Sequence, residues 1–320
     1  MGLKKALFPL ILLGLCTGCP PGDPVDRDFR ADMRQFVQRL AVHARKSQPQ
    51  FLVVPQNGQE LLTADGEADG PVSAAYVAAV DGQAREDLFY GYLNDNQATP
   101  AEDRAYLLAW MQRAEAEGVQ ALVADYCSTP AFEEDSYARN LAEGFVSFAA
   151  PRRDLDVIPA EAPREENAGD IDTLEQAKNM LYLLNPDGFD TKAAYLSALG
   201  ATNYDLLIID AFFNEEPLLE ADVAALQIKA NGGKRLVLSY MSIGEAEDYR
   251  YYWQSNWRPG NPSWIEAENP DWEGNYKVRY WDARWQAVIF GSEDAYLDRI
   301  VAAGFDGVYL DIIDAFEYFE

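Results

Sequence analysis

The order of the expected elements constrains this chain most, because the pattern begins on a helix and ends on a strand. Gly304 to Asp314 reads as a buried β-strand tipped with carboxylates, and only Ala315 to Glu320 follow it. Near the other end, Asp28 to Lys46 has the apolar spacing of a helix and precedes a first strand, Phe51 to Pro55. A repeating strand–helix ring cut at an unusual place would have this order. We therefore expect the ring to close between the last strand and the opening helix.

Eight short runs rich in Val, Ile, Leu or Tyr are the expected strands. Their continuous apolar character is typical of strands covered on both faces, as parallel sheets require. The runs are Phe51–Pro55, Ala75–Asp81, Ala121–Tyr126, Asn179–Leu184, Asp205–Asp210, Arg235–Tyr240, Lys277–Trp281 and Gly307–Ile312. Helical patterns lie between most of them, at Ala101–Glu117, Ser136–Glu143, Thr191–Leu199, Leu218–Asn231 and Glu293–Ala303. This alternation predicts an α/β fold of the (β/α)8 TIM-barrel type.

The length suits that fold, since such a barrel takes about 250 residues and the chain has 320, of which 48% are hydrophobic. Phe145–Ala149 is a ninth apolar run that the assignment does not use. The polar, proline-rich stretch at about 151–170 has the composition of a linker and falls between the third and fourth expected strands. We expect one barrel over residues 29–320, circularly permuted, with its ancestral termini joined at this linker. The alternative is a truncated barrel joined to an unrelated N-terminal domain.

Residues 1–19 resemble a bacterial lipoprotein signal peptide, with a basic start, an apolar run and lipidation at Cys19. Residues 20–28 would then form a tether. This predicts a protein anchored by lipid in the bacterial cell envelope, at the outer membrane or cell surface. Because Cys16 stands where such signals usually carry an aliphatic residue, ordinary secretion is the alternative.

Charge and composition exclude several classes of function. A net charge of -27 and a pI near 4.3 argue against nucleic acid and favour a neutral or cationic partner. The single histidine, His43, excludes a Ser-His-Asp device and the usual zinc sites. No glycine-rich phosphate loop is present, so we expect neither a nucleotide nor another cofactor, and no metal.

Carboxylates follow five of the expected strands. The active site of a barrel lies at the carboxyl ends of its strands, so acids there read as catalytic. They are Glu86, Asp125, Asp210, Glu245, Glu247, Asp311 and Asp314. Chemistry performed by carboxylic acids remains, and glycoside hydrolysis needs two of them, one protonated and one ionised.

Val237–Arg250, with Tyr204–Asp210 before it and Gly304–Asp311 after it, resembles glycoside hydrolase family 114, the endo-α-1,4-polygalactosaminidase type. The resemblance implies a (β/α)8 barrel. Residues 179–320 resemble the first five strands of that family, and Phe29–Asp125 resembles its last three, so the two halves are exchanged. Some family members carry a label relating them to cysteinyl-tRNA synthetase. That label fails here, because the chain has no spaced histidine pair, no Lys-Met-Ser-Lys-Ser loop and no Cys/His zinc cluster.

The resemblance implies that Glu86 and Asp311 are the paired catalytic acids. We assign Glu86 as general acid/base and Asp311 as nucleophile or electrostatic partner; the roles could be exchanged, and Asp314 could replace Asp311. Asp210, Glu247 and Asp125 would position substrate groups and help to keep one acid of the pair protonated. Glu245 would also bind substrate. The structural alternatives are a helix N-cap for Asp210 and a loop anchor to Arg250 for Glu245.

Aromatic and amide side chains complete the expected site. Six of the seven tryptophans lie between residues 253 and 285, and aromatic faces stack on sugars, so Trp253 is a candidate for substrate binding. The alternative is that these rings pin a long loop to the barrel. Tyr240 presents the same ambiguity. Gln56 and Asn57 follow a strand and could bond sugar hydroxyls, with a turn role for Asn57 as the alternative.

Two classes of function remain. The first is a glycosidase, endo-acting, that cleaves galactosamine-rich polysaccharide, because an acidic cleft suits a partly deacetylated, cationic polymer. The second is a surface barrel that binds glycan without cleaving it. Only the enzyme needs Glu86 and Asp311 to face each other.

Overall fold

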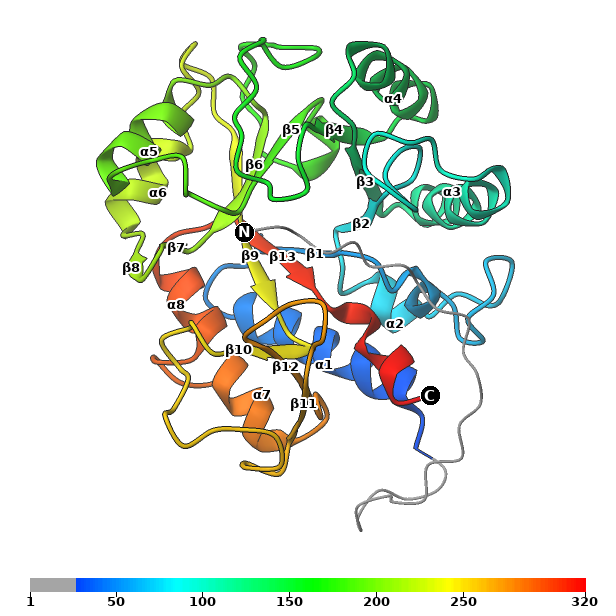
Figure 1. Cartoon of the computed structure of the whole chain (residues 1–320), viewed down its shortest axis with the longest axis vertical. Coiled ribbons are helices and arrows are strands. Elements are labelled where there is room, and N and C mark those ends of the chain that lie inside the picture. Colours follow the sequence, from blue (N-terminus) through cyan, green and yellow to red (C-terminus); the bar gives the residue numbers. More distant parts are fainter. Residues whose placement is uncertain (1–26) are drawn as a thin grey trace.

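The computed structural model describes residues 27–320, so the expected signal peptide and Cys19 lie outside the described residues. In this range strands alternate with helices, and eight strands run parallel to their neighbours (Figure 1). These strands are β1 (Leu52–Pro55), β2 (Gly82–Glu86), β3 (Gln120–Tyr126), β4 (Val146–Ala150), β5 (Met180–Leu183), β6 (Leu206–Asp210), β9 (Leu236–Ser242) and β13 (Gly307–Asp311).

Helices cover the outside of these strands, and an excursion follows β9. The helices are α1 (Phe29–Ala44), α2 (Ala74–Val77), α3 (Ala101–Ala116), α4 (Pro130–Glu143), α5 (Lys192–Gly200), α6 (Glu220–Leu226), α7 (Ala283–Ile289) and α8 (Tyr296–Ala302), with short 3-10 turns η1 (Gln59–Leu62), η2 (Leu174–Gln176) and η3 (Ile313–Tyr318). The short strands β7 (Phe212–Phe213) and β8 (Glu216–Pro217) form a ribbon. The excursion holds β10 (Glu245–Glu247), β11 (Ile265–Glu268) and β12 (Asn275–Val278).

The last strand pairs in parallel with the first. β13 lies between β1 and β9 in the order β1-β13-β9-β6-β5, and β2-β3-β4 form a second sheet. A parallel bridge between Gln56 and Ala84 links β1 to β2. β4 and β5 are in contact, and no ladder joins them in the described part of the chain. The protein is thus an α/β fold with parallel sheets, consistent with a TIM-like barrel, and the carboxyl ends of its strands face one side.

Two of the eight strand predictions were wrong, and one strand was left out of the assignment. Ala75–Asp81 is mostly the short helix α2, and the strand follows it as β2. β2 has no apolar run. Its residue Gln83 is fully buried, and this polar side chain is accommodated because it donates to the carbonyl oxygens of Asn57 (2.8 Å) and Ala84 (3.0 Å). The polar interior at this position conceals the strand from an analysis based on hydrophobicity.

The second wrong prediction concerns the excursion, and the strand left out is β4. Lys277–Trp281 overlaps β12, which pairs antiparallel with β10 and β11 and lies outside the parallel sheets. The unused run Phe145–Ala149 is β4, the neighbour of β3. Residues 174–320 therefore supply four of the eight parallel strands, rather than the five expected from the resemblance.

The opening helix lies against the end of the chain, as Figure 1 shows for α1 and the last turn. The Phe29 ring is 5.0 Å from that of Trp281 and 5.4 Å from that of Phe319. Arg30 forms an ion pair with Glu320 at 3.0 Å. The two extremes of the described chain are therefore packed together around β1 and β13.

The stretch at 151–170 has no helix or strand, yet its second half is fixed to the rest of the fold. The buried Lys229 ammonium group lies 2.9 Å from Asp205 and donates to the carbonyl oxygens of Asn167 (2.9 Å) and Gly169 (2.8 Å). Asn167 also donates to Asp205 at 2.9 Å. This segment therefore has the composition of a linker, yet it is bound to the protein and covers the amino-terminal end of β6.

Replacing Lys229 with Met should lower the free energy of unfolding by roughly 3–5 kcal/mol, because it leaves the Asp205 carboxylate buried without its counter-charge. Urea unfolding followed by circular dichroism measures the loss. Lys234→Met is the matched control, since Lys234 is mostly exposed and lies 3.6 Å from Asp172. A loss equal to that of the control would contradict the role given to this ion pair.

Candidate active site

The side chain of Gln56 brings Glu86 and Asp311 together. Its amide nitrogen lies 2.6 Å from Oε2 of Glu86 and 3.3 Å from Oδ1 of Asp311. These two carboxylate oxygens therefore cannot be further apart than the sum of those distances. Gln56 follows β1, Glu86 ends β2 and Asp311 ends β13, so three adjacent strands build the pair from opposite extremes of the described chain.

Tyrosines hold each member of the site from the neighbouring strands. The hydroxyl of Tyr126 donates to Glu86, and that of Tyr240 donates to Asp311 at 2.7 Å. Tyr182 donates to the amide oxygen of Gln56 at 3.0 Å, which fixes the amide orientation so that its nitrogen faces the acids. The pair is thus surrounded by donors on β3, β5 and β9, and each of its acids accepts more than one hydrogen bond.

Burial, and then the negative charge of Glu86, raise the pKa of Asp311 to about 8, although the Tyr240 hydroxyl acts in the opposite direction. Burial also raises the pKa values of Tyr126, Tyr182 and Tyr240 well above their usual range, so these phenols remain donors. Two carboxyl groups this close cannot easily both ionise. The pair therefore holds one proton near neutral pH, the state that acid–base chemistry requires.

A second group of charges lies beside the pair. The guanidinium of Arg250 is 2.7 Å from Asp210 and 2.6 Å from Glu247, and Tyr249 donates to Glu247 at 2.8 Å. Burial raises the pKa of Asp210, and Arg250 opposes that rise. Asp210 also accepts from the backbone N–H of Phe212 at 2.9 Å, in its own turn, and not from the start of α6 as an N-cap would.

Glu245 is not the anchor of Arg250, because that arginine pairs with Asp210 and Glu247. One oxygen of Glu245 accepts from the Asn269 amide at 2.9 Å, and burial raises the pKa of this acid. Its other oxygen is buried without a hydrogen-bond partner among the residues described. Glu245 therefore faces the base of the excursion.

Asp125 serves the scaffold. It is fully buried, and its oxygens accept from the backbone N–H of Phe89 (2.8 Å), from that of Tyr90 (3.2 Å) and from Ser136 (2.7 Å) and Asn140 (3.2 Å). These bonds tie the loop after β2 to α4. We therefore leave Asp125 out of the candidate site, although its position at a strand end suggested otherwise.

Asn57 and Asp314 border the pair. Asn57 has a φ of 60°, as a turn residue would, and its amide nitrogen lies 3.4 Å from Glu86. A Cβ on Gly58 would lie 2.9 Å from the Ile313 side chain, so this turn packs tightly on η3. Burial, and next Glu317, raise the pKa of Asp314 to about 7. Asp314 is thus a neighbour that adds to the charge felt by Asp311.

Most of the tryptophans pin the excursion to the barrel. Trp264 and Trp285 are buried, and the Trp285 indole donates to the carbonyl of Ile243 at 2.8 Å. Trp253 is partly buried and stacks on Tyr276 at 4.7 Å. Trp272 differs, with 57% of its side chain exposed. The loop-pinning alternative therefore describes this cluster better than a row of sugar platforms.

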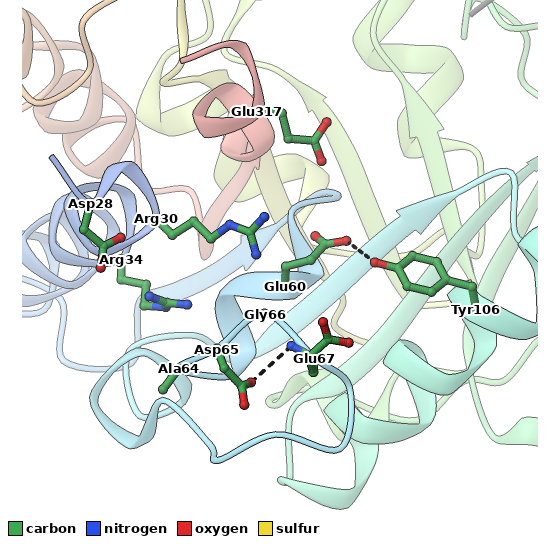
Figure 2. Close-up of a pocket in the computed structure, with 10 residues that line it drawn as sticks. All are labelled: Asp28, Arg30, Arg34, Glu60, Ala64, Asp65, Gly66, Glu67, Tyr106 and Glu317. Carbon is green, nitrogen blue, oxygen red and sulfur yellow. Dashed lines mark hydrogen bonds between the residues drawn. The ribbon is translucent and has the colours of Figure 1, made fainter. Parts of the chain in front are cut away.

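A cavity of about 630 Å³ lies between η1, η3 and the amino-terminal turn of α1 (Figure 2). It is lined by five acids and two arginines, namely Asp28, Glu60, Asp65, Glu67, Glu317, Arg30 and Arg34. Glu60 is 8% exposed; one of its oxygens accepts from Tyr106 at 2.7 Å, and the other is buried without a hydrogen-bond partner in the described range. The cavity is lined by residues of η1 and η3, the elements that follow Gln56 and Asp311 in the chain, and neither acid of the pair lines it.

Sequence reasoning missed Tyr126, Tyr182 and Arg153, which contact the site from β3, β5 and the segment after β4. Tyr126 follows directly on a strand-end acid, and that position was an available signal. Nothing in the local sequence marks Arg153, because its stretch has the composition of a linker. Within residues 27–320 no group of three or more His, Cys, Asp or Glu is arranged to hold a metal ion, and no helix is long and apolar enough to cross a membrane.

Comparisons with known proteins find relatives of part of the chain and one matching family model. Three relatives, all named only as uncharacterized proteins, come from Deinococcus radiodurans (41% identical over 122 residues), Methanocaldococcus jannaschii (34% over 176 residues) and Thermotoga maritima (37% over 120 residues). The matches cover 38%, 54% and 38% of this chain, and 37%, 49% and 36% of those relatives. The chain thus spans less than half the length of each.

The model of glycoside hydrolase family GH114 matches residues 174–320. This region runs from η2 through β5, β6, β9 and β13 and carries Asp210, Tyr240 and Asp311, whereas Glu86 and Gln56 come from the other half. Over residues 174–320, the chain is therefore similar to glycoside hydrolase family GH114.

Proposed function

We propose that this protein is a glycoside hydrolase that uses Glu86 and Asp311 as its two carboxylic acids. The observation that carries the proposal is the Gln56 amide, which lies within hydrogen-bonding distance of both acids and holds them close. Hydrolysis through a covalent intermediate needs carboxyl groups about 5–5.5 Å apart, and a water-mediated displacement needs about 6.5–9.5 Å. The close pair favours the first course, with retention of configuration.

One acid of the pair would protonate the leaving oxygen, and the other would attack the sugar or stabilise its positive charge. We keep Glu86 as general acid/base and Asp311 as nucleophile, since the backbone N–H of Ile312 fixes Asp311 at 2.8 Å and a nucleophile must be held rigidly. The raised pKa of Asp311 favours the exchanged roles in the empty site. Azide rescue of the two alanine variants decides between them, because loss of the nucleophile yields a glycosyl azide of inverted configuration, whereas loss of the general acid/base yields one of retained configuration.

We further propose a substrate rich in amino sugars, cleaved within the chain. The acidic cavity supports this, because its five acids outnumber its arginines and Glu60 has an oxygen free to accept from an ammonium group. A polymer that reaches from the acid pair into this cavity would place further sugars beyond the cleaved bond, as endo action requires. A barrel that binds glycan without cleaving it is the second candidate, and an inactive wild-type protein that binds the polymer would favour it.

The finer parts of the fold assignment also stand as proposals. We propose a closed (β/α)8 barrel whose halves are circularly permuted, with the ancestral termini at about 151–170. Supporting observations are the parallel pairing of β13 with β1 and the family match confined to the second half of the chain. We also propose export with a lipid anchor at Cys19 in the cell envelope, or secretion, from the leader sequence alone.

Glu86→Gln and Asp311→Asn should each reduce hydrolysis of partly deacetylated galactosaminoglycan by roughly 10²- to 10⁴-fold, because each removes an acid that the reaction needs. Release of reducing ends measures the rate. Asp125→Asn, which alters a buried scaffold acid, separates loss of folding from loss of chemistry when its thermal unfolding is compared. Full activity in either pair variant refutes the assignment.

Asp311→Asn should gain stability over the wild type as pH rises. The pKa of Asp311 is about 8 in the folded protein and about 4 in an unfolded chain. The folded state therefore binds more protons at this site between these values, and the contribution of Asp311 to the free energy of unfolding falls as pH rises through that window.

Asparagine does not titrate, so the melting temperature of the variant minus that of the wild type should increase from pH 5 to pH 8.5. Differential scanning calorimetry at several pH values measures this. Asp294→Asn serves as the control, because Asp294 is 92% exposed at its side chain. A difference that stays constant with pH would show that Asp311 is not held with a raised pKa.

Glu60→Gln should raise KM for a partly deacetylated polymer by roughly tenfold, the effect of losing one charge-assisted hydrogen bond, and should leave KM for a fully acetylated polymer within twofold. The negative charge of Glu60 attracts only a cationic sugar, so its loss should change KM for the partly deacetylated polymer and not for the acetylated one. Initial rates on the two polymers test this, with the exposed Glu293→Gln as control. Equal effects on both polymers would remove the cavity from the proposed substrate path.

A further inference from the structure

We propose that Arg153, from the segment that follows β4, is a positioning residue of the candidate site, because it clamps Tyr126 and Asp87 in the arrangement in which Tyr126 donates to Glu86. The inference rests on the proposed function. It assigns a role in the acid pair to a stretch whose composition indicated a linker only.

Arg153 covers the tyrosine that holds Glu86. Its guanidinium carbon lies 3.8 Å from the centre of the Tyr126 ring, within the range of a cation–π contact. A cation over the ring withdraws electron density from the phenol, so its hydroxyl becomes a stronger donor to the carboxylate. Removing the charge therefore weakens the bond between Tyr126 and Glu86 and frees the ring to move.

The guanidinium is itself held on its polar edges. It donates to Asp87 at 2.8 Å, to Asp95 at 2.8 Å and to the carbonyl of Gly91 at 3.1 Å. A Cβ on Gly91 would collide with the Asp87 carboxylate and approach the guanidinium, so the backbone comes this close only because residue 91 is glycine. These contacts define one orientation for Arg153, which a solvated surface arginine would lack.

Asp87 carries the effect to the backbone of Glu86. It follows Glu86 directly, has a φ of 62° and donates its N–H to the carbonyl of Ala124 at 2.9 Å. The left-handed backbone conformation is unfavourable for a residue other than glycine, and it persists where the surrounding structure fixes it. The ion pair with Arg153 supplies such a restraint at the residue that sets the direction of the Glu86 side chain.

The groups around Asp87 act on its titration in both directions. Burial raises the pKa of Asp87 to about 7, the charges of Arg153 and Arg85 oppose the rise, and the charge of Glu86 adds to it. Without Arg153, Asp87 would hold a proton to higher pH. Removing Arg153 therefore changes the titration of Asp87 in the same pH range in which Asp311 titrates.

Arg153→Met tests the inference, with Arg153→Lys as the conservative variant and Arg152→Met as the matched control. Arg152 is the adjacent residue, is 57% exposed at its side chain and, among the residues described, pairs with Asp156. We expect Arg153→Met to lower kcat by roughly 10- to 100-fold, the effect of a small misplacement, with KM within twofold, and millimolar guanidinium to restore part of kcat. Lysine should retain an intermediate rate.

A second measurement needs no substrate. Nuclear magnetic resonance of ring-labelled tyrosine, with Tyr126 assigned through Tyr126→Phe, should show a changed Tyr126 signal in Arg153→Met and an unchanged one in Arg152→Met. An unchanged signal, or full kcat in Arg153→Met, overturns the inference. A changed signal supports the clamp even where the wild type hydrolyses no glycan, an outcome that would defeat the proposed function alone.

Discussion

The parallel pairing of β13 with β1 is the constraint on which the candidate site depends. It places Asp311, near the end of the chain, on the strand next to the one that Gln56 follows, and the bridge from Gln56 to Ala84 then brings Glu86 alongside. Neither acid has the other as a neighbour in sequence. Without this pairing the amide of Gln56 would have no second carboxylate to contact, and the pKa of Asp311 would be raised only by burial and by the charge of Asp314.

The carboxylates of the site are stabilised in two different ways. Asp210 and Glu247 share the guanidinium of Arg250, so their charges are compensated inside the protein. Glu86 and Asp311 accept hydrogen bonds from phenols and amides, which are neutral donors, and no cation pairs with either in the described range. Neutral donors stabilise a carboxylate less than a cation does, so a proton can remain on the pair. The contrast supports the proposal that the pair is reactive and that the second group supports it.

Much of the fold could be predicted because hydrophobic runs mark buried parallel strands, as in Leu206–Asp210 and Leu236–Ser242. The failures have physical causes. β2 carries a buried glutamine in place of an apolar run, and Ala75–Asp81 has strand-like composition with a short helix inside it. Lys277–Trp281 contains Val278 and two aromatic residues, as a buried strand would, but its first part belongs to the antiparallel β12, and periodicity cannot report which sheet a strand joins.

By itself the sequence determined the alternation of elements, the acids at strand ends and the shortage of histidine that points to carboxylate chemistry. Only the tertiary structure decided how these acids divide: Glu86 with Asp311, Asp210 with Glu247, and Asp125 bonded into the scaffold. It also decided that residue 153, in a stretch with linker composition, lies over Tyr126. The reason is that sequence spacing fixes which residues share a strand end, whereas side-chain direction and partners depend on strands far apart in the chain.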